Sequence, residues 1–273
     1  MAKIVNDKYY TPKELAEYCV NKTKEIIGEN NISEWLEPSG GNGVFLDYLP
    51  KGTYSCDIEP EDLLGRVEKQ DYLELDIEYK KGRCVIGNPP FGSKNTLSVR
   101  FYKKSIQLCD YISFILPISQ LDNNMQMYEF DMVHSEDLDI KEYSDRNVHC
   151  CFNIYKRNKN GCNNKPNYKL KDIELIESRF QNKVVEKYDF KLMAWGGDKD
   201  LNKTANIIGK EIGADSSYAK EFYLICHNEK FLKSVLDVMN NTDWRKIYPM
   251  TATPNLLQWQ VYKYLKEQIP ELE

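Results

Sequence analysis

Four short apolar runs, separated by loops and by segments with a helical pattern, constrain the fold of this 273-residue chain more than any other feature. Each run is five to seven residues long, which is typical of a buried strand. The segments from Gly43 to Pro50 and from Thr96 to Asp110 have the pattern of helices. Strands that alternate with helices indicate a mostly parallel sheet with helices on both faces. The runs are SEWLEP, TYSCDI, RCVIGN and YISFILP.

A further helix is expected near the start of the chain, in YYTPKELAEYCVNKTKEIIG. Thr11 is the expected N-cap, Pro12 stands at the first helical position, and Glu14 would close a capping box. Gly28 follows the last turn, where helices commonly end.

The chain is expected to divide into two domains near residue 156. The segment DRNVHCCFNIYKR has the alternation of a half-buried strand, and the polar RNKNGCNNKPN after it is typical of a boundary. The rest of the chain shows weaker alternation and ends in a helix that Thr253 and Pro254 would open. We therefore expect an α/β domain over residues 1–156 and a smaller α+β module over residues 157–273. The alternating residues of the strand are Val148, Cys150, Phe152 and Ile154.

Composition favours a cytoplasmic protein without a membrane segment or a metal site. No run approaches the roughly 20 apolar residues that a membrane helix needs, and MAKIVNDKYY lacks the apolar stretch of a signal peptide. The eight cysteines are scattered without a CxxC motif, so we expect them to be reduced. The three histidines lie far apart in the sequence, which argues against a histidine-based metal site.

Charge is unevenly distributed, although the net value is -5 at pH 7. Residues 1–152 hold 17 Lys and Arg against 26 Asp and Glu, a net charge of -9. Residues 153–210 hold 13 against 7, a net charge of +6. A basic segment of this kind is either a solvated surface or a surface that contacts phosphates, and the charge alone is compatible with both.

A glycine turn follows the first strand, in WLEPSGGNGVF. Glu37 precedes Gly41-x-Gly43, and such a turn lets the backbone approach a ligand at the start of the next helix. Leu46 stands where a dinucleotide-binding fingerprint has its third glycine. The Lys-Ser/Thr pair that a phosphate-binding loop requires is also missing. The turn alone is therefore a weak sign of a binding site.

Two acidic residues follow at later strand ends. Asp57, in YSCDIEP, lies 14 residues after Gly43, where an acid can accept hydrogen bonds from both hydroxyls of a ribose. Asp71, in VEKQDYLEL, is placed to accept from an adenine amino group, and Tyr72 to stack on the ring. A lone acid in either place is usually a cap or part of a surface turn. In this order, however, the two indicate a cofactor that contains adenosine.

RCVIGNPPFGSKN carries the candidate for catalysis. The side chain of Asn88 and the peptide carbonyl of Pro89, held by the stiff Pro89-Pro90 backbone, offer two acceptors that converge on one amino group. An aryl amine is a poor nucleophile because its lone pair is delocalised into the ring. Two acceptors favour its reactive form and stabilise the charge that develops on attack. The ring of Phe91 supplies a face on which a planar base can stack, and such stacking stabilises the bound base by about 1–3 kcal/mol.

These features together resemble a known family, the S-adenosylmethionine-dependent DNA adenine-N6 methyltransferases. The similarity covers residues 9 to about 156, and its specificity comes from six motifs in the family's order. The matching motifs are YYTP (Tyr10, Thr11, Pro12), EPSGGNGVF (Glu37, Pro38, Ser39, Gly41, Gly43), CDIEP (Asp57, Ile58), QDY (Asp71, Tyr72), NPPF (Asn88, Pro89, Pro90, Phe91) and VHCCFNIYKR (Phe152). The family often has Ala or Cys where Gly40 stands, a change expected to loosen the loop without removing a ligand.

The resemblance implies a Rossmann-like methyltransferase fold, with residues 1–156 as the domain that binds S-adenosylmethionine through the first four motifs. It also implies methyl transfer to the N6 amino group of an adenine that is flipped out of double-stranded DNA, with S-adenosylhomocysteine as product and no metal. Residues 157–273 would recognise the target, and a restriction endonuclease is a candidate partner. By the same resemblance, Asn88 would also contact the cofactor, Phe91 and Phe152 would stack on the base, and Lys156, Arg157 and Trp195 would contact DNA.

Other substrates and roles stay open. Methyltransferases of a protein glutamine resemble this pattern, but they favour Tyr at the position of Phe91 and carry an extra helical domain before the cofactor motif. A base in structured RNA is a further alternative, whereas enzymes that act on the cytosine amino group usually have Ser in place of Asn88. A non-catalytic scaffold that binds DNA is disfavoured because every catalytic position is occupied.

Overall fold

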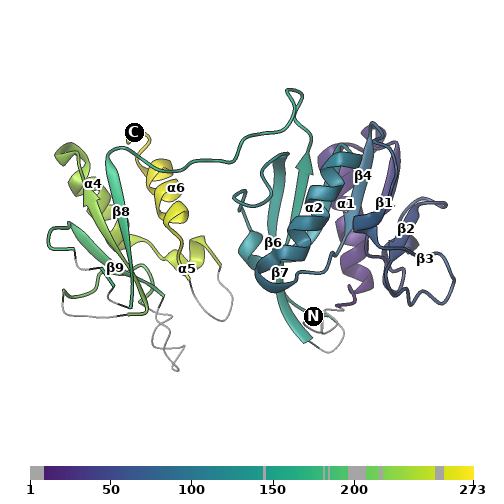
Figure 1. Ribbon diagram of the computed structural model, residues 1–273, viewed down its shortest axis with the longest axis horizontal. Coiled ribbons are helices and arrows are strands. Elements are labelled where there is room, and N and C mark those ends of the chain that lie inside the picture. The colour runs from purple at the N-terminus through teal and green to yellow at the C-terminus, as the bar shows by residue number, and fades with distance from the viewer. Residues whose placement is uncertain are drawn as a thin grey trace. The chain divides into compact units, whose positions relative to one another are not determined.

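A computed structural model describes residues 9–143, 146–180, 182–183, 185–195, 207–214, 218–249 and 255–273. The chain forms two compact units, Met1–Pro166 and Asn167–Glu273 (Figure 1). The assignment of a catalytic role to the first unit and a target-recognition role to the second stays a prediction.

The first unit is built around a sheet that has seven strands within the described residues, in the order β3-β2-β1-β4-β5-β7-β6. Strands β1 to β5 pair in parallel, whereas β7 runs antiparallel to both of its neighbours, β5 and β6. The four apolar runs of the sequence form β1, β2, β4 and β5, as predicted. The strands are β1 (Glu34–Glu37), β2 (Tyr54–Asp57), β3 (Glu68–Lys69), β4 (Arg83–Gly87), β5 (Tyr111–Pro117), β6 (Asp131–Tyr143) and β7 (Arg146–Lys156).

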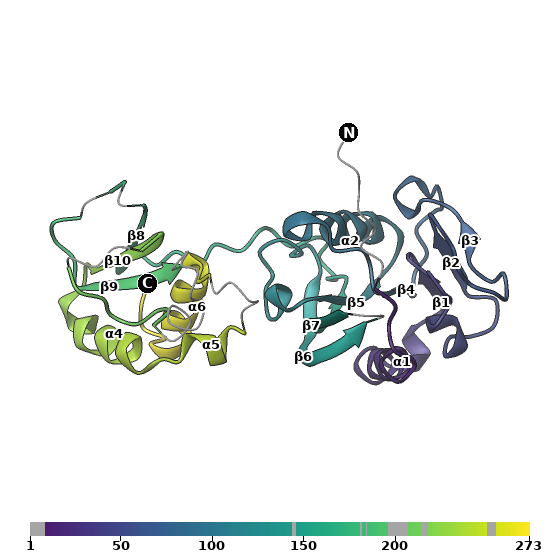
Figure 2. The same ribbon diagram turned by 90° about the horizontal axis from the view of Figure 1, so that it is seen from below.

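Two helices cover the two faces of this sheet, α1 (Lys13–Ile27) and α2 (Thr96–Leu108), as Figure 2 shows. Successive residues of β4 explain the arrangement, because side chains alternate between the faces of a strand. Cys84 and Ile86 pack in the core cluster that contains α1, whereas Val85 packs in the cluster that contains α2. Both faces of the central strands are therefore buried, as expected for a parallel sheet.

The start of α1 differs from the predicted capping box. Pro12 is the N-cap, with no side-chain capping hydrogen bond, and the helix begins at Lys13. The Thr11 side chain instead accepts a hydrogen bond from Asn88, a residue 77 positions later in the sequence. The predicted end of the helix is confirmed, because Gly28 has a φ of 84° and its N–H donates to the carbonyl of Lys24.

The helix expected between Gly43 and Pro50 is reduced to a single 3-10 turn, Phe45–Asp47. Gly43 has a φ of 78°, outside the helical region, and the residue before a proline is disfavoured in the helical region. Only one turn fits between these two positions. The other 3-10 turns of this unit are Glu29–Asn31, Tyr72–Glu74, Ser93–Asn95 and Ile118–Gln120.

The alternating sequence of β7 predicted a half-buried strand. In the structure the middle of this strand is buried on both faces. Cys150, Phe152 and Ile154 pack toward the cluster of α1, and Cys151 and Tyr155 pack toward that of α2. The reason is its position in the sheet, since β5 and β6 pair on either side of it and helices lie above and below. Its polar residue Asn153 is 0% exposed and donates to the carbonyl of Gln120 and to the hydroxyl of Tyr155.

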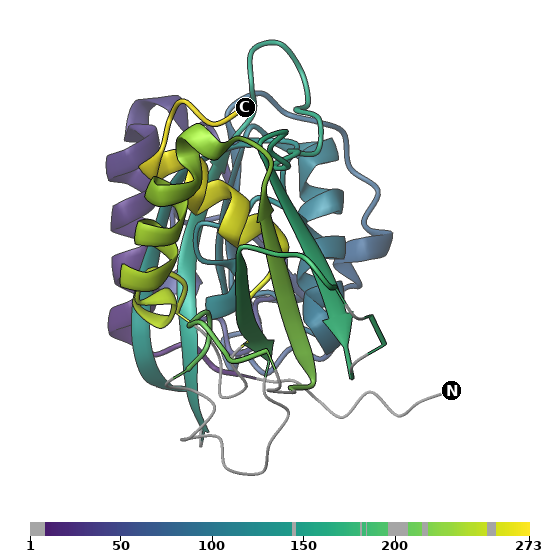
Figure 3. The same cartoon turned by 90° about the vertical axis from the view of Figure 1, so that its left-hand side faces the viewer.

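The second unit is an α+β module, as predicted. Its three-stranded antiparallel sheet has the order β8-β10-β9, and helices α4 and α6 pack on one face of it, as Figure 3 shows. The tail helix begins at Gln258, where the Gln260 side chain accepts from the N–H of Leu257. Its predicted opening residues Thr253 and Pro254 lie outside the described residues. The elements are β8 (Ile173–Arg179), β9 (Phe190–Trp195), β10 (Lys220–Cys226), α4 (Glu229–Asn241), α5 (Trp244–Ile247) and α6 (Gln258–Gln268).

The predicted fold class is confirmed in its architecture: the chain has a Rossmann-like, mostly parallel central sheet with helices on both faces, and a smaller α+β module. None of the helices in the described ranges has the length and apolar composition needed to cross a membrane.

Candidate active site

The candidate site lies at the carboxyl edge of the parallel strands in the first unit. Strands β1, β2 and β4 end at Glu37, Asp57 and Gly87, and the three strands are neighbours in the sheet. The glycine loop that follows β1 and the NPPF loop that follows β4 therefore begin side by side. Ligands of open α/β sheets bind at this edge.

Asn88 is held by a segment almost 80 positions earlier in the chain. Its Nδ2 donates to the backbone carbonyl of Tyr9 and to Oγ1 of Thr11, each at 3.2 Å. A carbonyl oxygen can only accept, so the amide nitrogen must face Tyr9 and the amide oxygen is turned the other way. No described residue donates to that oxygen. The YYTP segment thus fixes which end of the Asn88 amide is available to a ligand.

The NPPF loop is also attached to the glycine loop and to α2. Ser39 donates from its hydroxyl to the backbone carbonyl of Asn88 at 3.1 Å, and Ser98 in the first turn of α2 donates to that of Pro90 at 3.2 Å. Between them, the carbonyl of Pro89 receives no hydrogen bond from the described part of the chain. Two acceptors, the Asn88 side-chain oxygen and the Pro89 carbonyl, are therefore left open in one short, anchored loop.

Asp57 connects the end of β2 to the glycine loop. Its Oδ2 accepts from the N–H of Gly41 and its Oδ1 from the N–H of Glu59, both at 2.9 Å. Each carboxylate oxygen has lone pairs for more than one donor, so both oxygens are oriented and can still accept from a ligand. Ile58, the next residue, is 61% exposed beside it.

Glu37 is a buried carboxyl group at the end of β1, 1% exposed. It accepts a hydrogen bond from the Ser55 hydroxyl of β2 at 2.8 Å. The pKa of Glu37 is raised to about 7, mainly by burial; the Ser55 hydrogen bond opposes this rise, and the nearby Asp57 contributes to it. A carboxyl group in this position is costly for the fold when it is charged, which points to a role other than stability.

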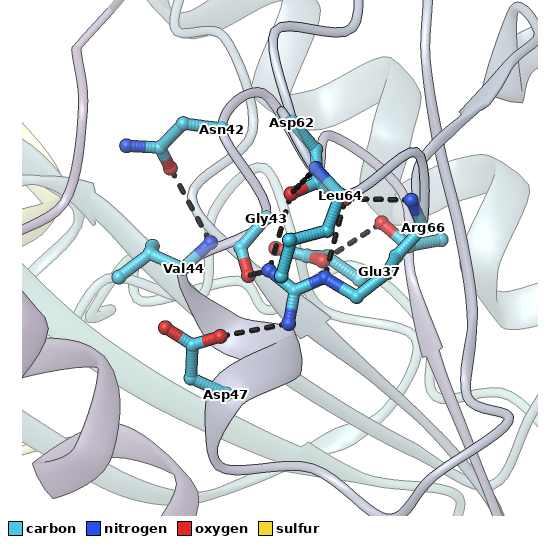
Figure 4. Close-up of polar contacts among 9 residues, drawn as sticks. Glu37, Asn42, Gly43, Val44, Asp47, Asp62, Leu64 and Arg66 are labelled. Carbon is cyan, nitrogen blue, oxygen red and sulfur yellow. Dashed lines mark hydrogen bonds and ion pairs between the residues drawn. The ribbon is translucent and has the colours of Figure 1, made fainter.

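Arg66 joins the glycine loop to the segment that follows β2, as Figure 4 shows. Its guanidinium donates to the carbonyl of Gly43 at 3.1 Å and pairs with Asp47 at 2.7 Å and with Asp62 at 3.2 Å. Burial alone would raise the pKa of Asp62, but hydrogen bonds from the Arg66 side chain and backbone lower it overall. A β-carbon on Gly43 would lie 2.9 Å from side-chain atoms of both Asp62 and Arg66, and its φ of 78° is one that other residues rarely adopt, so any substitution there would be strained.

Gly40, expected to loosen the loop relative to the Ala or Cys of the family, stands where there is no room for a side chain. A β-carbon would lie 2.2 Å from the Ser55 hydroxyl oxygen and 2.9 Å from both methyl groups of Val67. Replacing Gly40 with alanine should therefore displace Ser55 from Glu37.

We expect Gly40→Ala to lower the free energy of unfolding by about 1–3 kcal/mol, the usual cost of overpacking a filled site. Urea denaturation measures the change. Gly87→Ala is the matched control, because the nearest atom to its added β-carbon is 3.4 Å away. Equal stability of Gly40→Ala and Gly87→Ala would contradict the role assigned to Gly40.

Two aromatic residues that the sequence placed in the site are instead part of the core. Tyr72 is 1% exposed, packs against Phe101 at 5.2 Å between ring centroids, and hydrogen-bonds through its hydroxyl to Ser105. Phe152 is 0% exposed in the middle of β7. Neither ring presents a face to a ligand in this structure. Asp71, next to Tyr72, is exposed and caps the 3-10 turn by accepting from the N–H of Leu73.

Two of the residues predicted to contact DNA, Lys156 and Arg157, lie away from the NPPF loop within the first unit. Lys156 pairs in register with Tyr111 and Asp131, the first residues of β5 and β6, so it lies at the amino edge of the sheet, away from Asn88. Arg157 does not present a free guanidinium, because it pairs with Asp110 at 3.1 Å and donates to the carbonyl of Cys109 at the end of α2.

Trp195 belongs to the second unit, at the end of β9, and its ring meets that of Phe180 edge to face, with 6.5 Å between centroids. Residues 196–200, which follow Trp195 in the sequence, lie outside the described residues.

Sequence reasoning missed Tyr9, Ser55, Asp62 and Arg66. One signal was present for the last two, since EDLLGR places opposite charges four residues apart, a spacing that often marks an ion pair. Ser55 carried no such signal, because its partner Glu37 lies 18 positions away on another strand.

Comparison with known proteins identifies relatives by sequence, although no family model matches the chain. Two type II methyltransferases of Haemophilus influenzae, M.HincII and M.HindII, are each 29% identical to the chain over 137 residues, or 44% of the chain. The defense against restriction protein B of Escherichia phage P1 is 30% identical over 100 residues, 32% of the chain and 4% of that protein. The chain spans about a quarter of the length of the two methyltransferases, 26% and 25% respectively.

Solved structures with a partly similar fold include a subunit of a restriction enzyme and an rRNA methyltransferase. The M protein of the type I restriction enzyme EcoKI is 14% identical with a TM-score of 0.42, covering 58% of the chain and 46% of that protein. The 23S rRNA methyltransferase ErmE is 14% identical with a TM-score of 0.41, covering 56% and 70%. These weak similarities assign neither a substrate nor an activity. The sequence matches, in contrast, confirm that the chain resembles the methyltransferases of restriction-modification systems.

Proposed function

We propose that this chain transfers the methyl group of S-adenosylmethionine to the exocyclic N6 amino group of an adenine in double-stranded DNA. The observation that carries the proposal is the anchoring of Asn88. Its amide nitrogen is tied to Tyr9 and Thr11, and its oxygen and the Pro89 carbonyl stay open as acceptors. Two fixed acceptors in one loop fit an amino group, which has two N–H donors.

The carboxyl edge of the sheet fits S-adenosylmethionine. Asp57, held by the N–H groups of Gly41 and Glu59, has its oxygens oriented to accept from the two ribose hydroxyls. Glu37 offers a buried negative charge near the glycine loop, which suits a ligand with a positively charged amino group and sulfonium. A ligand cation would also offset the cost of charging Glu37 at neutral pH. When bound, S-adenosylmethionine supplies an electrophilic methyl group.

The chain's own residues would prepare the amine for attack. Asn88 and Pro89 would accept its two N–H groups, which favours the pyramidal form whose lone pair is available. The same acceptors would stabilise the positive charge that develops on the nitrogen, and because they are fixed beforehand they need little reorganisation. Phe91, part of the same loop, would stack on the ring and keep the amine in line.

An adenine of duplex DNA must leave the helix to reach such a site, at a cost of a few kcal/mol. The DNA substrate is supported by the sequence similarity to the type II methyltransferases M.HincII and M.HindII. Residues 157–273 would then supply recognition of the target sequence, with Trp195 as a candidate contact.

Incubation of the purified protein with tritiated S-adenosylmethionine tests the substrate class. Unmethylated plasmid DNA, total RNA and total protein are supplied together, and the label is counted in each fraction. We expect label in DNA alone. Label in RNA or in protein, with none in DNA, would contradict the proposal and favour a base of structured RNA or a protein glutamine.

Arg66→Ala should weaken binding of S-adenosylmethionine about tenfold. The reason is that the Gly43 carbonyl loses a charged donor, and such hydrogen bonds contribute roughly 1.5–3 kcal/mol. Isothermal calorimetry measures the dissociation constant. Arg100→Ala is the matched control, since Arg100 is exposed and forms no ion pair with any described residue. Unchanged affinity in Arg66→Ala would contradict a role of Arg66 in shaping the cofactor loop.

A further inference from the structure

Consecutive tyrosines at the start of the described chain face two different loops. The ring of Tyr10 lies over the glycine loop, with its nearest atom 3.6 Å from where a β-carbon on Gly41 would be, and its hydroxyl donates to Glu61. The ring of Tyr9 lies against Phe91 of the NPPF loop. Tyr10 thus lies on the cofactor side of the site, and Tyr9 lies on the catalytic side.

The rings of Tyr9 and Phe91 are nearly parallel. Their centroids are 6.0 Å apart and their planes differ by 21°. Both residues are partly buried and pack against the same core cluster. A planar base with aromatic contact on both faces needs about 7 Å between the rings, twice a carbon–carbon contact of about 3.5 Å. The two rings are therefore stacked on each other, and they must move apart before a base can enter between them.

Tyr9 is coupled to catalysis through its backbone as well. Its carbonyl accepts one N–H of the Asn88 amide, so the main chain of Tyr9 is fixed relative to the two open acceptors. This hydrogen bond involves only the main chain of Tyr9, so a substitution of its side chain leaves the acceptor in place. The residue expected to form the second wall, Phe152, is 0% exposed within β7 and presents no ring face to a ligand in this structure.

We propose that Tyr9 forms the second wall of the target-base pocket, so that a flipped base stacks between Tyr9 and Phe91. In the unliganded protein the two rings stack on each other, and rotation of the Tyr9 side chain away from Phe91 would admit the base. The inference rests on the proposed function and narrows its substrate class. Two aromatic walls stabilise a flat heterocycle, whereas the side-chain amide of a glutamine gains little from them.

Methylation kinetics on unmethylated double-stranded DNA test this role, with S-adenosylmethionine affinity measured in parallel by calorimetry. Tyr9→Ala should lower kcat/KM for DNA about 10- to 100-fold, the value of one stacking face, and leave the cofactor dissociation constant within about twofold. Tyr9→Phe should retain activity, because the proposal requires the ring and not the hydroxyl. Both variants keep the backbone carbonyl that holds Asn88.

Tyr10→Ala is the matched control, since it changes the neighbouring ring and should produce the opposite pattern. We expect weaker cofactor binding in Tyr10→Ala and the larger loss of DNA turnover in Tyr9→Ala. If wild-type protein methylates DNA and Tyr9→Ala does so equally well, the base clamp is wrong while the proposed function stands. Equal loss of cofactor affinity and DNA turnover in Tyr9→Ala would assign Tyr9 a structural role and also overturn the clamp. A wild type that binds cofactor but methylates no DNA would overturn the proposed function, and the clamp with it.

Discussion

Asn88→Ala is expected to lower the rate of methylation by about 10³-fold or more while the protein stays folded and binds S-adenosylmethionine. The substitution removes one of two preorganised acceptors at the amine, and loss of a single such group costs about 10²- to 10³-fold in other enzymes. The lost interaction is made most strongly in the transition state, so kcat should fall rather than KM rise. Single-turnover measurements of methyl transfer give this rate directly.

Asn95→Ala is the control for Asn88→Ala. Asn95 lies in the same loop, and its side chain donates to Ser119 at 3.1 Å rather than to the YYTP segment. We expect Asn95→Ala to keep methylation within about tenfold of the wild type, since it removes one neutral surface hydrogen bond. Comparable losses in the two variants would mean that loop conformation, and not the Asn88 acceptor, controls the reaction.

Glu37→Gln should make the protein more stable at pH 8, by about 3 kcal/mol. Burial raises the pKa of Glu37 from 4.5 to about 7, and each pH unit of such a difference is worth about 1.4 kcal/mol. Below pH 4.5 the carboxyl is protonated in both the folded and the unfolded chain, so it imposes no penalty. The penalty grows as the pH rises from 4.5 to 7 and is constant above that. A neutral glutamine can still accept from Ser55 and avoids the penalty.

Urea denaturation of the wild type and of Glu37→Gln across pH 4.5 to 8 measures this effect. The difference in unfolding free energy should be close to zero at the acid end and largest at pH 8. The same variant should bind S-adenosylmethionine more weakly, because the proposed negative charge is lost. A difference that does not depend on pH would contradict the assignment of a raised pKa to Glu37.

Glu34→Gln, at the other end of β1, should show the opposite trend. Burial alone would raise the pKa of Glu34, but hydrogen bonds from Lys80 and Arg83 lower it overall. A lowered pKa adds stability above the ordinary carboxyl pKa, and this stability is lost as the pH falls through the folded-state value. Glu34→Gln should therefore be less stable than the wild type at pH 8, and the two should converge in acid.

The sheet could be predicted from the sequence because its signals are local. Each of the four apolar runs carries its own pattern, and the alternation of strands with helices is enough to predict parallel pairing. A helix was predicted where the structure has only the 3-10 turn Phe45–Asp47. The apolar pattern alone gives little weight to the glycines before this turn and the proline after it. The contacts of Arg157 could not be predicted, because its partners Cys109 and Asp110 lie more than 40 positions away in the sequence.

The candidate site could be predicted only where a motif is contiguous. The NPPF tetrapeptide and the glycine turn were recognised, but the contact between Asn88 and Tyr9 spans 79 positions and leaves no trace in either segment. The burial of Phe152 and Tyr72 could not be predicted from the sequence for a related reason. An aromatic residue that follows a motif looks the same in sequence whether it faces a ligand or the core, and its packing depends on which strands lie beside it.

Nucleoside mass spectrometry of DNA after incubation with the protein and S-adenosylmethionine tests the proposed reaction most directly. Unmethylated double-stranded DNA is digested to nucleosides, and the wild type is compared with Asn88→Ala. We expect N6-methyladenosine in its deoxy form from the wild type and about 10³-fold less from the variant. Methylated cytosine as the product, or no methylated nucleoside from a protein that binds the cofactor, would contradict the assignment of Asn88 and Pro89 to an adenine amine.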